Sequence, residues 1–503
     1  MNRSFWLGIA PVAALALAFG STPLARADNG TDSFALRGAL SSGGIGTHLT
    51  ALQGIATANS GNRAAGTSGY AASAAYVQAK LTTAGYTVTT QPFTYDKFFE
   101  NTDAVLAQTA PGTTAYTYLT DFFTMTYSGS GVVAAPVSAV DLLLPPTGGS
   151  TSGCEATDFA GFPAGNIALI QRGTCTFRIK ADNALAAGAS AVIIFNEGNA
   201  PDRTGLFGGT LESPAAGLPV LSASFALGNA LAATPGLRMR LKVDARIETV
   251  NSVNVLADTP AGRADRLVVV GAHLDSVAEG AGINDNGSGT ATTLEIALQM
   301  SNLKISPRNK VRFAFWGGEE DGLIGSTHYV KQLSKTEIRK HHVNLNFDML
   351  GSPNFVRFVY DGNGSIGDAG PNGSDVIESV FLDYFAGQGL AAAPTGFDGR
   401  SDYGPFIEAG IPAGGLFSGA EDLKTAAEAA TYGGTAGVAY DACYHAACDG
   451  LANINNTALD QLGDAAAHAI LTFAMTTSAV NGTSQGQGSG NADFEFKGPL
   501  ARK

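Results

Sequence analysis

Residues of the types that bind metal ions recur along the second half of this 503-residue sequence, at the ends of apolar stretches and in two loops. They are His273, Asp275, Asp285, Glu319, Glu320, Asp348 and His445. Taken singly, each has an ordinary structural explanation, because an Asp at a strand end commonly caps a helix and a lone His is usually a core or surface residue. Carboxylates gathered at one edge, however, would repel one another unless a cation held them. The joint pattern therefore indicates a metal site.

The donor atoms of these residues favour zinc as the metal. A mixture of imidazole nitrogen and carboxylate oxygen suits zinc, although cobalt or manganese could occupy the same ligands in vitro. Two histidines and three carboxylates are too many for one tetrahedral zinc with an open position, but they fit two zinc ions that share a bridging carboxylate. Paired metals about 3.5–4 Å apart hold a water and stabilise a tetrahedral intermediate. One acidic residue beside the ligands would then be left as a general base, so the pattern indicates metal-assisted hydrolysis.

Three apolar stretches are expected to form the strands that position these residues. They span 267–270, 311–316 and 343–347, with a helix at 290–303 between the first two. Continuous apolar strands that alternate with helices indicate an α/β fold with a mixed, mostly parallel sheet flanked by helices. In such folds ligands bind at the carboxyl ends of the strands. We therefore expect the candidate residues that follow these stretches to meet at one edge of the sheet.

The chain before this sheet divides into a helical region and a β-rich region. The apolar spacing between Tyr70 and Leu81 predicts a helix that leads into a strand at 86–90. From about 128 to 247, short β-rich runs are separated by Gly, Pro and Ser clusters. Within this region we predict strands at 167–170 and 191–195 and a helix at 179–187. The change of character indicates a second unit of β-rich α+β type.

Six short segments resemble, in order and spacing, the secreted dizinc leucyl-type aminopeptidases, a family that includes the vacuolar aminopeptidase Y type. They are GAHLDS (271–276), GINDNGSG (282–289), FWGGEE (315–320), NFDM (346–349), GRSDY (399–403) and CYHAAC (443–448). The resemblance covers nearly the whole mature chain and implies a zinc exopeptidase fold of the phosphorylase/hydrolase-like type with two Zn²⁺ as cofactors. The activity it implies is hydrolysis of the N-terminal peptide bond of peptides, with a preference for large apolar N-terminal residues such as Leu.

The resemblance also implies which residues bind the metals. Asp285 would bridge the two zinc ions. His273 and Asp348 would hold one ion, and Glu320 and His445 would hold the other.

Four further residues receive roles from the same resemblance. Glu319 would be the general base that takes a proton from the attacking water and passes it to the leaving amine. Asp275 would orient the imidazole of His273. Tyr444 would donate to the developing oxyanion. Arg400 matches a position near the substrate pocket, the alternative being a surface arginine.

The β-rich region resembles a protease-associated (PA) domain at 166–177 and 191–196. Such a domain implies either a role in substrate access or a simple spacer, and it supplies no catalytic residue. We expect a signal peptide at 1–27, the N-terminal part of the peptidase domain at 28–127 and the PA insert at 128–248. The catalytic domain would follow at 249–480 and a flexible tail at 481–503.

The expected signal peptide consists of Arg3, an apolar stretch at 5–19 and the small-x-small pattern Ala25-Arg26-Ala27. The apolar stretch is too short to span a bilayer, which needs about 20 residues, so we expect cleavage near Ala27 and secretion. Export permits disulfides, and proximity predicts that the four cysteines pair as Cys154–Cys175 and Cys443–Cys448. The alternative, a four-cysteine zinc site, would need different spacings.

The remaining features limit the partners and leave two alternative functions open. A net charge of -13 argues against nucleic acid as a partner, and no stretch after the signal peptide is long and apolar enough for a membrane. We expect a monomer that acts on peptides. The alternatives are a related zinc carboxypeptidase or glutaminyl cyclase, and a non-catalytic binding relative. None of the five expected ligands is missing, and apart from Arg400 no basic cluster is available to bind a substrate carboxylate.

Overall fold

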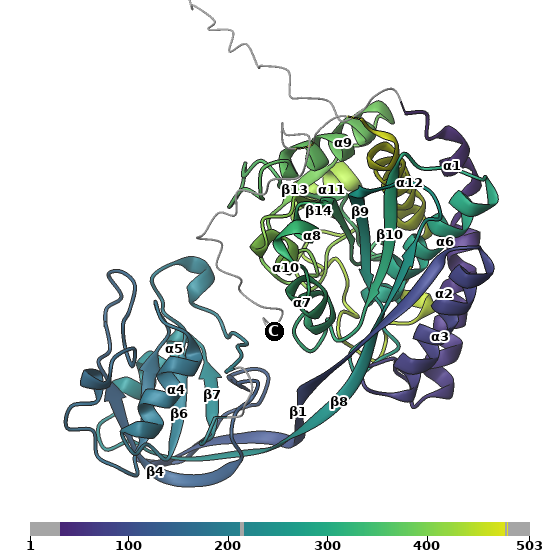
Figure 1. Ribbon diagram of the computed structural model, residues 1–503. Helices are drawn as coiled ribbons and strands as arrows, with labels where there is room; N and C mark the ends of the chain where they lie inside the picture. Colours follow the sequence, from purple (N-terminus) through teal and green to yellow (C-terminus); the bar gives the residue numbers. More distant parts are fainter. Residues whose placement is uncertain (1–30, 212–215, 478–479, 481–503) are drawn as a thin grey trace, which may run out of the picture.

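The computed structural model describes residues 31–211, 216–477 and 480, which form a larger and a smaller unit joined by a long two-stranded ribbon (Figure 1). The expected signal peptide at 1–27 and the expected tail at 481–503 lie outside the described residues.

The larger unit is built on a mixed sheet with the strand order β13-β12-β14-β11-β9-β10-β8. Its strands are β8 (Arg238–Asp258), β9 (Arg263–His273), β10 (Asn309–Trp316), β11 (His341–Phe347), β12 (Phe358–Tyr360), β13 (Ala393–Thr395) and β14 (Ala413–Phe417). The central strands β10, β9, β11 and β14 are parallel, whereas β8 and β12 run antiparallel to their inner neighbours. The predicted mixed, mostly parallel sheet is thus confirmed.

Helices cover both faces of this sheet, which is why its central strands are apolar at consecutive positions. Val268 and Val270 of β9 pack into the core formed with the longer helices, whereas Val269 packs on the opposite face against Tyr329 and Phe406. The longer helices are α2 (Ser42–Ala58), α3 (Ser68–Thr83), α6 (Gly289–Asn302), α9 (Ser374–Gly387) and α12 (Asn456–Met475). The shorter ones are α1 (Phe34–Ala39), α7 (Ile324–Lys331), α8 (Lys335–Ile338), α10 (Gly404–Glu408) and α11 (Ala426–Tyr432).

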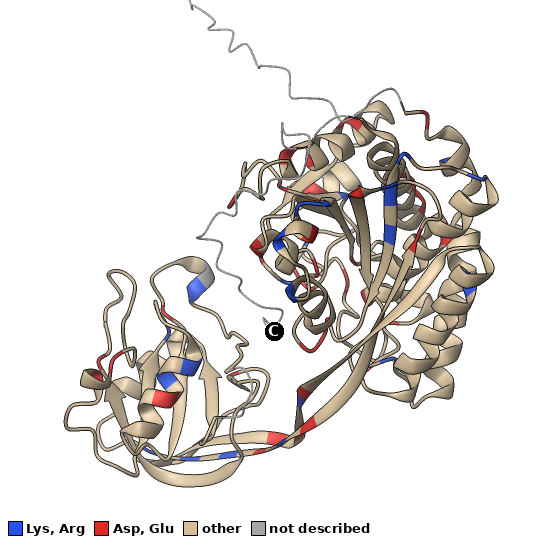
Figure 2. Ribbon diagram, in the orientation of Figure 1, with Lys and Arg blue, Asp and Glu red and all other residues tan. Residues whose placement is uncertain are grey.

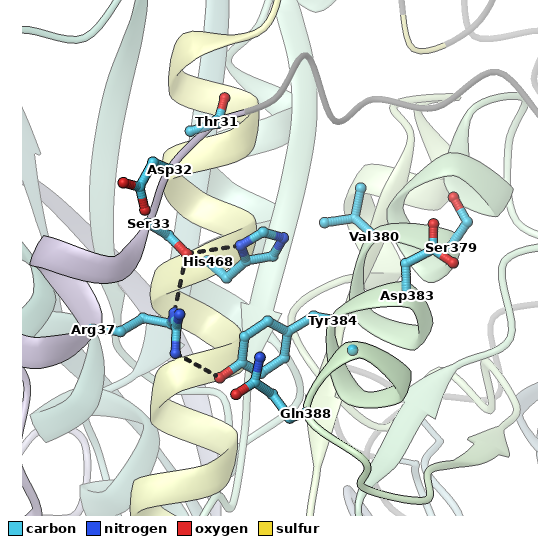
Figure 3. Close-up of a pocket in the computed structure, with 11 residues that line it drawn as sticks. Thr31, Asp32, Ser33, Arg37, Ser379, Val380, Asp383, Tyr384, Gln388 and His468 are labelled. Atoms are coloured by element: carbon cyan, nitrogen blue, oxygen red, sulfur yellow. Dashed lines mark hydrogen bonds between the residues drawn. The ribbon is translucent and has the colours of Figure 1, made fainter.

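The first helix, α1, is held against α9 and α12 by side-chain contacts (Figure 3). Ser33, just before α1, lies 2.9 Å from the ring nitrogen Nδ1 of His468 on α12, and Arg37 of α1 donates to the hydroxyl of Tyr384 on α9. The rings of Tyr384 and His468 stack with their centroids 5.0 Å apart. The pocket between these three helices contains none of the predicted metal ligands, and we interpret its contacts as structural.

The ribbon consists of β1 (Thr87–Ala110) and β8, paired antiparallel from Thr87 opposite Asp258 to Ala110 opposite Arg238. One end of β8 pairs with β10 in the larger sheet, and its other end pairs with β4 of the smaller unit. The two units therefore share continuous strands (Figure 1).

The smaller unit has a four-stranded parallel core, β4-β5-β6-β7, with helices on both sides. Its elements are β2 (Thr114–Ala115), β3 (Phe122–Thr124), β4 (Gly131–Val140), η1 (Ala156–Phe159), β5 (Ile167–Gln171), α4 (Phe177–Ala186), β6 (Ala191–Phe195), η2 (Pro201–Arg203), β7 (Val220–Ala223) and α5 (Phe225–Ala232). Cys154 and Cys175 form a disulfide in this unit, as the sequence predicts. Leu106 of β1 and Phe122 of β3 belong to its core, so the unit takes in residues before the expected boundary at 128. The ribbon carries β1 from the larger sheet into this unit.

Within the described ranges, none of the helices combines the length and apolar character needed to cross a bilayer.

Candidate metal centre

The predicted metal ligands are brought together at one edge of the larger sheet. His273 is the last residue of β9, Glu320 follows β10 after a short turn, and Asp348 comes directly after β11. Because these strands are parallel and adjacent, their carboxyl ends meet, as the strand pattern predicts. Asp285 lies in η3 (Ile283–Ser288), the turn that leads into α6, and His445 lies in the loop before η4 (Leu451–Asn453).

The first group of candidate ligands centres on His273. Its Nε2 atom lies 3.2 Å from Asp285 Oδ1 and 3.2 Å from Asp348 Oδ1. The His273 side chain is almost completely buried. One ligand atom from each of the three residues lies within 4.8 Å of the others, a spacing at which one ion could contact all three.

The second group centres on His445 and shares Asp285 with the first. His445 Nε2 lies 3.1 Å from Asp285 Oδ2 and 3.0 Å from Glu320 Oε2. Asp285 thus turns one carboxylate oxygen towards each histidine, so its carboxylate lies between the two groups. This is the arrangement expected of a carboxylate that bridges two metal ions.

The polar atoms of these groups fit a bound cation. Glu320 Oε1 and Asp348 Oδ1 are buried and have no hydrogen-bond partner among the described residues. Leaving a buried carboxylate oxygen without a partner is costly, and a metal ion would satisfy it. Although burial alone lowers the pKa of His445, the Glu320 and Asp285 carboxylates raise it to about 10. The carboxylates therefore stabilise positive charge at this position, and imidazole with carboxylate is a donor set suited to zinc.

Glu319 lies beside the two groups but belongs to neither of them. Its Oε2 atom is 3.9 Å from His273 Nε2, and its side chain is almost fully buried. Burial and the nearby carboxylates of Asp348 and Asp402 raise the pKa of Glu319 well above its usual value, even though His273 opposes the shift. A carboxylate with a raised pKa next to a hydrolytic metal site is suited to accept and return a proton.

Asp275 connects the histidine and the glutamate pair. Its Oδ1 atom lies 3.7 Å from Nδ1 of His273, on the side of the ring away from Asp285. The backbone N–H groups of Glu319 and Glu320 both donate to its carboxylate, each over 3.3 Å. Asp275 therefore restrains the turn after β10. Its distance from His273 Nδ1, which has no hydrogen-bond partner among the described residues, is too long for a hydrogen bond, so orientation of the imidazole by Asp275 stays a prediction.

Tyr444 and Arg400 form one wall of the same site. The ring of Tyr444 stacks on the ring of His445, with centroids 3.8 Å apart. Arg400 donates to the Tyr444 hydroxyl over 3.1 Å and pairs with Glu421, also over 3.1 Å. Arg400 is thus held in the cleft and is not a free surface side chain. The disulfide Cys443–Cys448, which the sequence predicts, encloses Tyr444 and His445 in a short loop.

Three residues that support the site were not singled out from the sequence. Asp449 accepts hydrogen bonds from the backbone N–H groups of Asn284 and Asp285, over 2.8 and 3.0 Å. Ser401 donates to Asp348 Oδ2 over 2.6 Å, and Glu421 holds Arg400. Ser401 lies in the GRSDY segment next to Arg400, so this motif could have identified Ser401 from the sequence. Asp449 and Glu421 stand in no recognised motif.

A cavity of about 270 Å³ opens from the metal centre. Its lining includes the apolar and aromatic side chains of Met349, Phe358, Tyr360, Phe417 and Tyr440. Carboxylates of Asp398, Glu421 and Asp422 also line it. The cavity therefore offers an apolar surface for a side chain and negative charge for an ammonium group.

Comparisons with known proteins agree with this geometry. Residues 254–470 match peptidase family M28, and residues 133–231 match the PA domain. An aminopeptidase of Pseudomonas aeruginosa (strain UCBPP-PA14) is 51% identical over 435 residues, which are 86% of this chain and 81% of that protein. A probable leucine aminopeptidase 2 of Aspergillus fumigatus is 42% identical over 368 residues, covering 72% of this chain and 70% of its own.

Solved structures give the same result. The aminopeptidase from Aneurinibacillus sp. strain AM-1 superposes with a TM-score of 0.70 at 27% identity and covers 90% of this chain and 98% of its own. A zinc aminopeptidase from Bacillus subtilis gives a TM-score of 0.57 at 26% identity and covers 88% and 97%. The chain belongs to peptidase family M28 and is a zinc-dependent aminopeptidase with a PA domain.

Proposed function

We propose that this enzyme removes single residues from the N-termini of peptides at a centre in which Asp285 would bind two zinc ions. The observation that carries the proposal is the position of the Asp285 carboxylate, which presents one oxygen to His273 and the other to His445. In this assignment Asp348 completes one zinc site and Glu320 completes the other. Zinc held by these residues would lower the pKa of a bound water molecule and polarise the carbonyl of the cleaved bond.

Glu319 is the proposed general base. It faces the same space as the ligands, and its raised pKa favours the protonated form once it has taken a proton from the attacking water. The same carboxyl group then gives that proton to the leaving amine. Asp275 positions Glu319 for this transfer, because its carboxylate accepts a hydrogen bond from the backbone N–H of Glu319.

Tyr444 is the proposed donor to the carbonyl oxygen as negative charge develops on it. Its hydroxyl accepts a hydrogen bond from Arg400, so its own proton is left to point towards the cleft. A donor held in place before the reaction stabilises the transition state without reorganisation. Arg400 acts here by positioning Tyr444, and Glu421 fixes the guanidinium.

The cavity beside the metal centre is the proposed binding site for the N-terminal residue. Its aromatic and apolar lining favours a large apolar side chain such as Leu, because each CH₂ group it buries contributes about 0.8 kcal/mol. Asp398, Glu421 and Asp422 also line this cavity, and their carboxylates contribute negative charge for the free ammonium group of the substrate.

The proposed location of the enzyme is outside the cell, after removal of residues 1–27. Two disulfides support this proposal, since stable disulfides are typical of proteins in oxidising compartments. We further propose that the enzyme acts as a monomer on peptide substrates.

A series of aminoacyl anilides, assayed with and without a chelator, tests the proposed activity. We expect the leucyl anilide to be cleaved faster than the glycyl anilide, chelation to abolish both activities, and added Zn²⁺ to restore them. An N-terminally acetylated leucyl anilide is the matched control, because it has no free ammonium group and should not be cleaved. Cleavage of the acetylated compound, or activity that survives complete metal removal, would contradict the proposal.

A further inference from the structure

A second cavity adjoins the metal centre where the two units meet. It encloses about 420 Å³ and is lined by residues 97–103 of β1, by residues of the smaller unit between 118 and 127, and by the 276–279 loop after β9. Glu320 lines this cavity as well as the cavity proposed for the N-terminal residue. The two cavities therefore meet at one of the proposed zinc ligands.

Acidic and basic residues both occur along the ribbon (Figure 2), but the charged residues that line this second cavity are mostly acidic. Besides Glu320, the acidic residues that line it are Glu100, Asp103, Glu279 and Asp321, and Lys97 is the one basic residue among those that line it. Lys97 and Asp321 neutralise each other, because Lys97 Nζ lies 2.8 Å from Asp321 Oδ2, and this leaves Glu100, Asp103 and Glu279 beside Glu320. Asp103 and Glu279 are exposed, one on β1 and the other on the loop of the larger unit. A positively charged group that enters the cavity is therefore attracted by carboxylates of both units.

Aromatic rings line the same cavity, among them Phe98, Phe99, Tyr118 and Phe123. The ring of Phe99 makes cation–π contacts with two side chains of the protein: Lys97 Nζ lies 5.6 Å from the ring centroid, and the Arg246 guanidinium lies 4.4 Å from it. Rings of this kind pack against the aliphatic part of a lysine or arginine and attract its charge. Carboxylates together with aromatic rings therefore provide the surface that a basic side chain requires.

We propose that this cavity binds the part of the peptide that follows the cleaved bond, and that it favours substrates with Lys or Arg at the second or third position. The proposal rests on the proposed aminopeptidase function. With the first residue in the aromatic cavity and the cleaved bond at the metal ligands, the remaining chain leaves past Glu320. An extended peptide advances roughly 3.3–3.6 Å per residue, so the second and third side chains fall within about 10 Å of the cleaved bond. The PA domain thereby contributes to substrate selection through β1 and the 118–127 segment.

The test compares two peptide amides, Leu-Lys-Ala-Ala and Leu-Glu-Ala-Ala, with the zinc-loaded full-length enzyme. Each kcat/KM is divided by the value for leucyl anilide, so that a general change in activity cancels. At low ionic strength we expect the lysine peptide to be preferred at least about fivefold, and we expect salt to reduce this preference because it screens exposed charges. In the double variant Asp103→Asn/Glu279→Gln, the preference for the lysine peptide should be about two- to fivefold smaller than in the wild type, which is roughly the effect of exposed charge pairs.

The matched control is Glu408→Gln, which removes one negative charge from an exposed residue of α10 that lines neither cavity. It should leave the preference unchanged. If leucyl anilide is not cleaved at all, the proposed function itself fails. If the anilide is cleaved but the two peptides are used equally, the cavity does not select basic residues. An unchanged preference in the double variant, or an equal loss in the control variant, would also overturn the inference.

Discussion

Arg400 donates a hydrogen bond to the hydroxyl of Tyr444 over 3.1 Å, although the two residues are 44 positions apart in the chain. The guanidinium is fixed from its other side by Glu421, and the Tyr444 ring is fixed by stacking on His445. The proposed oxyanion donor and a proposed zinc ligand are therefore held as one packed unit.

Replacing Tyr444 with Phe should lower kcat by about 10²-fold, the size of effect typical of an oxyanion donor, while KM changes little. Arg400→Lys keeps the charge but loses the forked geometry, so it should lower kcat by a smaller factor. Steady-state kinetics on leucyl anilide measure both. Because Arg400 acts through Tyr444, adding Arg400→Lys to the Phe variant should cost little more. Full multiplication of the two losses would show that Arg400 acts independently.

Glu319→Ala should lower kcat by several orders of magnitude and leave the metal content unchanged, because Glu319 belongs to neither group of ligands. Asp285→Ala should lose metal, since its carboxylate contributes to both groups. Metal analysis of the purified variants beside activity assays separates the two effects. Zinc loss in the Glu319 variant with retention in the Asp285 variant would reverse the assignment.

The disulfide Cys443–Cys448 should matter more for activity than for stability. It closes a loop of only a few residues, and the stabilisation by a cross-link grows with loop length. Replacing both cysteines with Ser should lower kcat at least about tenfold, equivalent to about 1.4 kcal/mol, and shift Tm little. Tyr444→Phe should then cost less in the Ser variant than in the disulfide-bonded enzyme. A large fall in Tm with unchanged kcat would make the disulfide a purely structural link.

Lys180 in the smaller unit should make stability depend on pH. Burial lowers the pKa of its ammonium group from 10.5 to about 8, so the unfolded chain binds more protons than the folded protein between these values. The free-energy cost of burying the charged ammonium group, up to about 3 kcal/mol, is present in full below pH 8 and disappears as the pH rises towards 10.5. The free energy of unfolding of the wild type should therefore rise with pH relative to that of Lys180→Met. Denaturant unfolding at pH 7 and pH 10 measures this difference, with the exposed Lys304→Met as control. An equal difference at both pH values would contradict the assignment.

The sequence by itself determined the larger sheet and the set of candidate ligands. Strands β9, β10 and β11 are apolar at consecutive positions because they are buried on both faces, and that pattern is visible without a structure. His273, Glu320 and Asp348 were identifiable because each stands at or just after the carboxyl end of such a strand. The disulfide pairs were identifiable because each joins cysteines that lie close together in the chain.

Only the tertiary structure decided how these residues are supported and what surrounds them. Asp449 holds the backbone of Asp285 from 164 positions away, and no local pattern encodes a hydrogen bond of that separation. The extent of the smaller unit was likewise decided by the ribbon, since its strands are continuous between the two units and β8 pairs with a strand of each. The second cavity exists only because that ribbon brings residues 97–127 beside the loop after β9. Strand patterns follow from burial of neighbouring residues, whereas contacts between distant segments depend on how complete elements pack.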